Sequence, residues 1–273
     1  GDSKRFSTGS KKIHVDIDPA EINKSIRVDV PVVGNIKDVF GQLIPEVKST
    51  THVEWLQHIE HLKAEHPSLR IPESDRLMGQ HVVKALSDIT QGEAIITTGV
   101  GQHQMWAAQH YQFKNANSWL SSGGSGTMGY EVPSAIGAQV GNPDSLVWSI
   151  CGDGGFQMTM MELATAAENG LPVKYAILNN NHLGMITQWQ AFFYNEDYQA
   201  ETYSGNPDFV KLAEAYGIKG IRVSKQDELE SAINEANNHD GPVVVDFVIE
   251  KVDDVYPMIP AGQSIEELIE EPN

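Results

Sequence analysis

Residues 152–180 read GDGGFQMTMMELATAAENGLPVKYAILNN, and this stretch indicates both a fold and a binding site. An apolar run ends at Gly152, which is typical of a buried strand, and a helical pattern follows it. A second apolar run then leads to Asn179 and Asn180. Two adjacent parallel strands would place Asp153 and Asn180 side by side at their carboxyl ends, which is the edge where open α/β sheets bind ligands.

The polar groups at this edge suit a magnesium ion that holds a diphosphate. Asp153 offers a charged oxygen and Asn180 a neutral one, and Mg²⁺ takes few protein oxygens besides those of phosphate and water. Gly154 and Gly155 leave room for a phosphate, and a helix expected to begin near Gln157 would direct free N–H groups at it. An Asp and an Asn that only cap turns are the simpler alternative. The 24 residues between GDG and NN favour the site.

The paired GDG and NN motifs resemble the signature of thiamine diphosphate enzymes. By this resemblance, the side chains of Asp153 and Asn180 and the carbonyl of His182 bind Mg²⁺. Three further motifs, TTGVGQHQMWAAQ at 97–109, GTMGY at 126–130 and GMITQWQ at 184–190, resemble the acetohydroxyacid synthase (acetolactate synthase) catalytic subunit. The similarity covers nearly all of residues 10–265, and the motifs occur in the family's order.

The resemblance implies roles for individual residues. Gln102 and His103 would donate hydrogen bonds to phosphate oxygens, and Met128 would support the bent form of the cofactor. Met185 and Trp189 would line the substrate channel, where Trp189 favours 2-oxobutyrate as the second substrate. A plain helix cap at His103 and a core Met–Trp pair are the alternatives. The implied cofactor contacts are Gly101, Gln102, His103, Gly126, Met128, Gly152, Asp153, Gly154, Gly155, Asn180, His182, Gly184 and Met185.

One position departs from the family. Residue 131, after Gly129-Tyr130, is usually Gly in the family, and here it is Glu131. A carboxylate at a helix start is electrostatically favourable. It nevertheless places a charge near the cofactor.

Strands and helices alternate along most of the chain. The expected strands are 94–98, 117–121, 146–151, 173–179, 218–223 and 243–249, and the expected helices are 79–90, 103–110, 132–140, 157–169, 207–216 and 226–238. This pattern predicts an α/β fold: a doubly wound parallel sheet with helices on both faces, here the thiamine diphosphate-binding fold, preceded by the end of a second α/β domain.

The predicted domains are the end of a middle, FAD-binding-like domain (1–48), a connector (49–75), a diphosphate- and Mg-binding domain (76–250) and a carboxyl-terminal tail or lid (251–273). The first contains strands at 13–17 and 30–34, a helix start at Asp18-Pro19 and a helical stretch over 35–47, and the connector contains a helix at 53–65. The resemblance places Asp16 and Ile17 near the adenosine of FAD, although a solvated strand end is equally consistent with the residues. The tail residues 257–262 resemble a lid over the substrate channel.

Composition excludes several classes of partner. The 273 residues carry 37 acidic and 19 basic side chains, a net charge of −18, which argues against nucleic acid and against an anionic membrane surface. No apolar run reaches the 18 residues of a membrane span. The single cysteine, Cys151, follows an apolar strand and is interpreted as a core residue. A lone cysteine suits a reducing compartment, so a cytoplasmic location is expected.

The implied reaction decarboxylates pyruvate and joins the two-carbon unit to a second 2-oxo acid, pyruvate or 2-oxobutyrate. The products are 2-acetolactate or 2-aceto-2-hydroxybutyrate, on the route to isoleucine, leucine and valine. The family's essential Glu belongs to an amino-terminal domain that this sequence lacks, so the chain alone is expected to be inactive. FAD in the full-length protein, a homodimer or homotetramer and a small regulatory subunit are also implied. Pyruvate oxidase, a FAD-free acetolactate synthase and a non-catalytic diphosphate-binding module are the alternatives.

Overall fold

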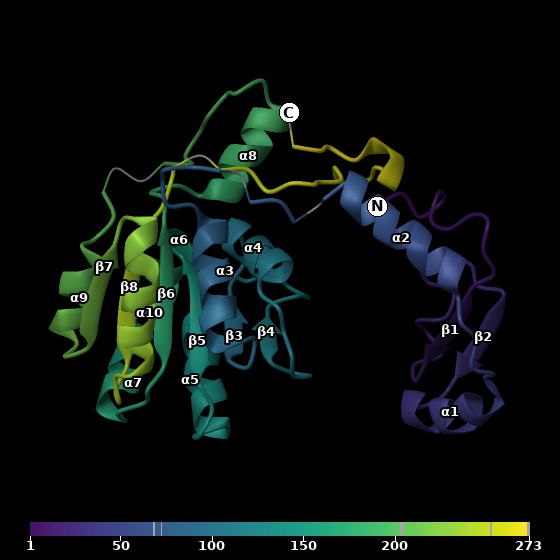
Figure 1. Cartoon of the computed structure of the whole chain (residues 1–273), viewed down its shortest axis with the longest axis horizontal. Coiled ribbons are helices and arrows are strands. Elements are labelled where there is room, and N and C mark those ends of the chain that lie inside the picture. The colour runs from purple at the N-terminus through teal and green to yellow at the C-terminus, as the bar shows by residue number, and fades with distance from the viewer. Residues whose placement is uncertain (68, 72, 203–204, 252, 272–273) are drawn as a thin grey trace. The chain divides into compact units, whose positions relative to one another are not determined.

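The computed structural model describes the chain except residues 68, 72, 203–204, 252 and 272–273 (Figure 1). The described residues form two compact units, those within 1–68 and 256–273, and those within 69–255. Within these described ranges, no helix has the length and apolar character needed to cross a membrane.

The larger unit contains a six-stranded sheet in which every pairing is parallel, in the order β4-β3-β5-β6-β8-β7. Its strands are β3 (Ile95–Thr98), β4 (Trp119–Ser121), β5 (Val147–Gly152), β6 (Lys174–Asn179), β7 (Lys219–Val223) and β8 (Val243–Val248). The main helices are α3 (Gly79–Thr90), α4 (Gln102–His110), α5 (Glu131–Gly141), α6 (Asp153–Thr159), α7 (Leu163–Glu168), α8 (Gly184–Phe193), α9 (Phe209–Ala215) and α10 (Leu229–Asn237). The predicted doubly wound parallel fold is therefore confirmed.

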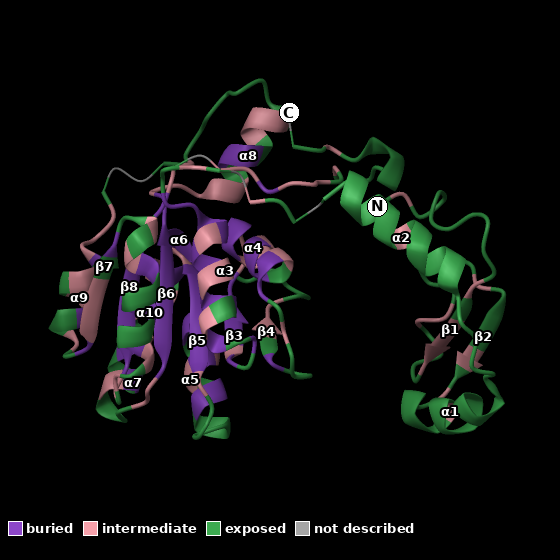
Figure 2. Cartoon of the chain, viewed as in Figure 1, coloured by how far each residue is buried: buried purple, intermediate pink, exposed green. Residues whose placement is uncertain are grey.

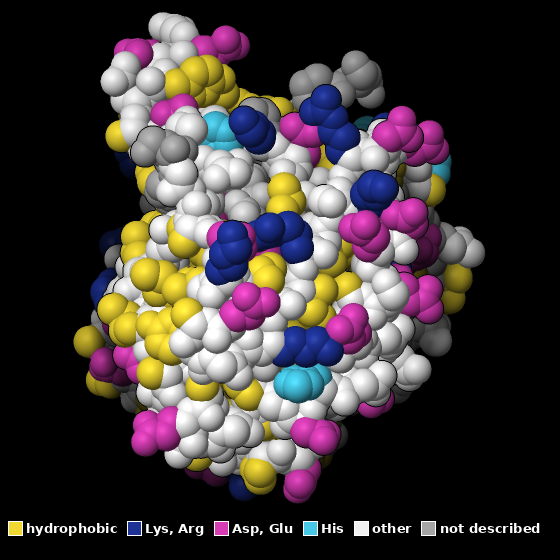
Figure 3. Space-filling view, turned by 90° about the vertical axis from the view of Figure 1, so that its left-hand side faces the viewer, with side chains coloured by type: hydrophobic (Ala, Val, Ile, Leu, Met, Phe, Trp, Pro, Cys, Tyr) yellow, Lys and Arg dark blue, Asp and Glu magenta, His cyan; other side chains and the backbone are white. Residues whose placement is uncertain are grey.

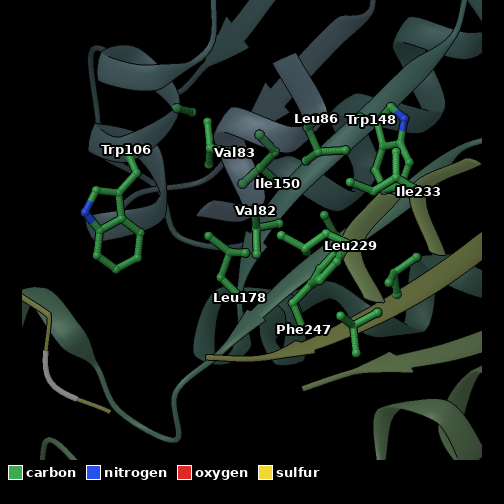
Figure 4. Packing of buried hydrophobic residues seen from close by; sticks show 14 of the residues in the cluster. Val82, Val83, Leu86, Trp106, Trp148, Ile150, Leu178, Leu229, Ile233 and Phe247 are labelled. Atoms are coloured by element: carbon green, nitrogen blue, oxygen red, sulfur yellow. The ribbon is translucent and has the colours of Figure 1, made fainter. Parts of the chain in front are cut away.

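Two apolar clusters cover the two faces of this sheet. On one face, α3, α4 and α10 contribute Leu86, Trp106 and Ile233 to a cluster that also contains strand residues such as Ile150 and Phe247 (Figure 4). On the other face, α5, α6, α7 and α9 contribute the second cluster. The central strands are therefore buried on both sides (Figure 2), as expected of strands that read as continuous apolar runs.

Several strand and helix boundaries were predicted to within one or two residues. The prediction of one continuous helix over 157–169 was wrong. The structure has α6, then a 3-10 turn at Met160–Glu162, then α7. Thr159 interrupts the helix with φ −134°, and its Oγ1 donates a hydrogen bond to the Gly129 carbonyl at 2.7 Å. The helix also begins at Asp153 rather than near Gln157, so its free N–H groups lie at the GDG motif.

The smaller unit contains the parallel pair β1 (Ile13–Asp16) and β2 (Val30–Val33), with α1 (Ile36–Leu43), α2 (Val53–Glu65) and 3-10 turns at Ile44–Glu46 and Ile265–Glu267. The helix expected at Asp18-Pro19 is wrong, because turns occupy this segment. Asp18 Oδ1 accepts a hydrogen bond from Ala20 N at 2.8 Å, and Asn23 adopts a left-handed conformation with φ 64°. Pro45 cannot donate a backbone hydrogen bond, which explains why α1 gives way to a 3-10 turn.

Basic side chains on the face shown in Figure 3 lie among acidic ones. At the β7 edge, Lys219 Nζ lies 2.7 Å from Glu235 Oε1, and Arg222 pairs with both Asp208 and Asp246. This face therefore presents mixed charge rather than a basic patch.

Candidate active site

The sheet changes its winding direction between β3 and β5. From β3 the chain passes through α4 to β4 on one side, and then returns through α5 to β5 on the other side of β3. The loops after β3 and β5 therefore diverge, and an open cavity lies at the carboxyl ends of these two strands. Doubly wound sheets bind their ligands at such a switch point.

The structure brings most of the sequence-assigned residues together in this cavity. Every residue given an implied cofactor contact, except Gly126, lines it. The lining also includes apolar residues that the sequence analysis did not assign: Val100, Trp106, Leu178, Leu183, Ile186 and Ile249. Ile249 could have been found by the same reasoning as Asn180, because it follows a neighbouring parallel strand at the same sheet edge.

Three hydrogen bonds hold the Asp153 carboxylate, which lines the cavity. Its Oδ2 accepts hydrogen bonds from Asn181 N and Asn206 Nδ2, both at 2.7 Å, whereas Oδ1 accepts only the Gly154 N–H at 2.9 Å among the bonds of the described chain. Because a carboxylate oxygen has two lone pairs, Oδ1 keeps capacity for a cation. Burial raises the pKa of Asp153 to about 6 although these donors oppose the shift.

Sequence reasoning missed Asn206, which no motif marks. Its amide also donates to Asn179 Oδ1 at 3.0 Å and accepts from Gln157 Nε2 at 2.9 Å. Asn179 in turn donates to Asp246 Oδ1 at 2.9 Å. The two asparagines of the NN motif therefore differ: Asn179 belongs to this buried network, and Asn180 lines the cavity.

The remaining oxygens near Asp153 are neutral. Asn180 is buried and its Oδ1 accepts the His182 N–H at 3.1 Å, while half-buried His182 has a pKa lowered mainly by burial. In the described parts of the chain no group of three or more His, Cys, Asp or Glu could enclose a metal. One carboxylate with neutral oxygens fits Mg²⁺, which is usually bound through one or two carboxylates together with phosphates.

His103 fits the second part of a diphosphate site. Its ring is buried, and burial lowers its pKa to about 4, so the imidazole is neutral at neutral pH. No described atom pairs with His103 Nε2, although the residue lines the cavity. A neutral imidazole can donate one N–H, and a buried polar atom without a partner is costly, so an anionic oxygen in the cavity would satisfy it.

Gln102 is already engaged within the protein. Its Nε2 donates to Gln188 Oε1 at 3.0 Å and to the Asp253 carbonyl at 2.8 Å, which uses both amide hydrogens. Donation from Gln102 to a phosphate would require one of these bonds to break. A Cβ on Gly184 would lie 1.9 Å from Gln102 Oε1, so glycine at the start of α8 permits this close packing.

The two proposed channel residues lie on α8 but in different surroundings. Met185 lines the cavity. Trp189 is 37% exposed and contacts Phe193 edge to face at a centroid distance of 5.2 Å. The interpretation of Trp189 as a core residue loses support from this exposure, while its role in substrate selection stays a prediction.

The predicted FAD and lid residues belong to the smaller unit. Asp16 ends β1 and accepts the Asp18 N–H at 2.9 Å, and Ile17 is 69% exposed. Residues 257–262 belong to the same unit. Their roles stay predictions.

Comparison with known proteins agrees with this site. The family model described as "Thiamine pyrophosphate enzyme, C-terminal TPP binding domain" matches residues 99–247. The acetolactate synthase large subunit of Corynebacterium glutamicum is 45% identical over 97% of this chain and 44% of its own length. The acetolactate synthase catalytic subunit, mitochondrial, of Saccharomyces cerevisiae is 43% identical over 94% of this chain and 38% of its own length.

The tobacco (Nicotiana tabacum) protein "Acetolactate synthase 1, chloroplastic" is 40% identical over 99% of this chain and 43% of its own length. The chain thus spans less than half the length of each of these relatives. The predicted resemblance to acetolactate synthase is confirmed by these matches. The cavity described above lies almost wholly within the matched residues 99–247, and on this basis the chain belongs to the thiamine pyrophosphate enzyme family, whose C-terminal cofactor-binding domain it contains.

Proposed function

We propose that this chain forms the diphosphate- and Mg²⁺-binding part of an acetolactate synthase. The observation that carries the proposal is the cavity at the β3–β5 switch point, which combines the Asp153 carboxylate with the unpartnered Nε2 of His103. A cation and an anion would satisfy these two groups together. The similarity to acetolactate synthases over almost the whole chain supports the same conclusion.

Each polar residue has a definite part in this proposal. Asp153 Oδ1, the Asn180 side-chain oxygen and the His182 carbonyl would hold Mg²⁺, and the His103 N–H would meet a diphosphate oxygen. Asn206 and the Asn181 N–H keep the Asp153 carboxylate in one orientation. When bound, thiamine diphosphate would supply the electron sink for decarboxylation of a 2-oxo acid.

The apolar residues would control access and orientation. Met128, Met185 and Ile249 line the cavity from three different segments and would exclude water from the reacting centre. Met128 would also support the bent cofactor, and Trp189 would contact the second substrate on the outer part of α8.

The proposed substrates are pyruvate and a second 2-oxo acid, pyruvate or 2-oxobutyrate. The products would be 2-acetolactate and 2-aceto-2-hydroxybutyrate, which serve branched-chain amino acid synthesis. The proposal also includes cytoplasmic full-length chains that assemble as a homodimer or homotetramer, with FAD and a small regulatory subunit. A neighbouring subunit would contribute the pyrimidine-binding domain and its Glu.

The test is a chimera in which this chain replaces the matching part of the Corynebacterium glutamicum relative. With pyruvate, Mg²⁺ and thiamine diphosphate, the chimera should form acetolactate, detected as acetoin after acid treatment. A chimera that folds and binds the cofactor but releases carbon dioxide without forming acetolactate would favour a simple decarboxylase instead.

A further inference from the structure

Glu131 is a buried acid that the proposed function leaves without a role. It is the first residue of α5, and its side chain is fully buried. Neither carboxyl oxygen has a hydrogen-bond partner of good geometry among the described residues. The backbone N–H groups of Gly129 and of Glu131 itself lie toward the carboxyl and weakly favour its charged form. A buried carboxyl without partners is destabilising when it is charged.

Two glycines create the space for this carboxyl. A Cβ on Gly99, directly after β3, would lie 2.0 Å from Glu131 Oε2, and a Cβ on Gly155, in α6, would lie 2.5 Å from Glu131 Oε1. Gly155 lines the cavity. The carboxyl therefore lies immediately behind the cavity wall, between the loop that begins at Gly99 and the first turn of α6, which the proposed diphosphate would contact.

The backbone of Glu131 is fixed in this position. Its carbonyl accepts hydrogen bonds from Thr97 Oγ1 at 2.9 Å and from Ser149 Oγ at 3.0 Å, one from β3 and one from β5. On this fixed backbone the Glu131 side chain is fully buried, so the carboxyl has no contact with solvent. It must therefore respond to a change in pH by changing its protonation.

No cation balances Glu131 within the described chain. Among the elements that pack against α5, the polar side chains of β3 are the neutral Thr97 and Thr98. The titratable group of β5 is the Cys151 thiol, and burial raises the pKa of this thiol. The titratable group of α6 is the Asp153 carboxyl. The imidazole of His103, which lines the cavity, is neutral at neutral pH because burial lowers its pKa to about 4. Burial consequently raises the pKa of Glu131 to about 7.

We propose that Glu131 is a protonation-controlled residue of the cofactor site, whose neutral acid form permits diphosphate binding and whose carboxylate form opposes it. The inference rests on the proposed function. Ionisation places a negative charge behind Gly155, against the negative oxygens of the diphosphate. By linkage, a bound diphosphate holds the proton on Glu131.

Calorimetric titration of Mg²⁺ and thiamine diphosphate into wild type and Glu131→Gln tests this inference. Because only the neutral fraction of Glu131 binds, the ratio of the wild-type Kd to the variant Kd should rise about tenfold from about pH 6 to about pH 8, on either side of the Glu131 pKa of about 7. The ratio cancels the titration of Asp153 and of the diphosphate. Glu168→Gln, which removes an exposed charge at the end of α7, should leave the corresponding ratio unchanged.

A wild-type to Glu131→Gln ratio that stays constant with pH would overturn the inference and leave the proposed function standing. Absence of binding by both proteins at every pH would overturn the proposed function and the inference with it. If Glu131→Gln does not fold, the inference is tested instead on the wild type, through the infrared band of a protonated carboxyl. Near neutral pH this band should grow when Mg²⁺ and thiamine diphosphate are added, and a band that weakens or does not change contradicts the inference.

Discussion

Asn206 Nδ2 donates a hydrogen bond to Asp153 Oδ2 at 2.7 Å, although 53 residues separate the two in the chain. The same amide reaches Asn179, which continues through Asp246 to Arg222 at the sheet edge. This network holds one oxygen of Asp153, while the other accepts only the Gly154 N–H among the bonds of the described chain and keeps capacity for a cation. We propose Asp153 as a Mg²⁺ ligand, and residues that orient a metal ligand commonly affect metal affinity strongly.

We therefore expect Asn206→Ala to weaken Mg²⁺ binding in the presence of thiamine diphosphate by roughly 10-fold or more. Titration calorimetry measures this, and Asn115→Ala, an exposed asparagine in the same unit, is the control. A variant that loses thermal stability but keeps its Mg²⁺ affinity would show that Asn206 acts only in folding.

Trp189→Leu should lower the ratio of acetohydroxybutyrate to acetolactate made from mixed 2-oxo acids in the chimeric enzyme. The side chain is only partly covered, so its removal should alter a channel wall more than the core. Tyr194→Leu, which removes a more exposed aromatic next to the end of α8, is the control. If the product ratio is unchanged and the melting temperature falls, Trp189 is a packing residue.

The free energy of unfolding should depend on pH in a way that reports the protonation of buried Glu131. Its folded-state pKa, about 7, lies above the ordinary value of 4.5, so the folded protein binds this proton more tightly than the unfolded chain does. The associated stability is present below about pH 4.5 and is lost as the pH rises through about 7. Over this window, the free energy of unfolding of wild type should fall by roughly 3 kcal/mol more than that of Glu131→Gln. Chemical denaturation at a series of pH values measures the difference, and parallel curves would show that Glu131 is not buried as a neutral acid.

The 273-residue chain alone should form no acetolactate. It contains the proposed diphosphate site, whereas in our proposal the Glu that acts at the pyrimidine ring comes from a neighbouring subunit. An acetoin assay with pyruvate, Mg²⁺ and thiamine diphosphate tests this. A turnover of about 1 per second or more, comparable to intact enzymes, would show that the catalytic groups lie within this chain.

The sequence predicted the parts of the site that strand ends determine. Asp153 and Asn180 follow apolar runs, and parallel pairing of β5 with β6 brings their ends to one edge. Asn206 could not be predicted in this way, because its place depends on how the chain returns from α8 to α9. The burial of Glu131 also escaped prediction, since the space for it is created by Gly99 and Gly155 on other segments. The break in the helix at Thr159 could not be predicted either, because the hydrogen bond from Thr159 to the Gly129 carbonyl is a tertiary contact.

The most direct test of the proposed site is calorimetric titration of thiamine diphosphate with Mg²⁺ into this chain and into Asp153→Ala, with Asp144→Ala, an exposed carboxylate before β5, as the control. Wild type and Asp144→Ala should show the same saturable, Mg²⁺-dependent binding. Asp153→Ala should bind at least about 100-fold more weakly, because the single carboxylate near the cation is lost. Unchanged affinity in a folded Asp153→Ala protein would contradict the assignment of the cavity as the cofactor site.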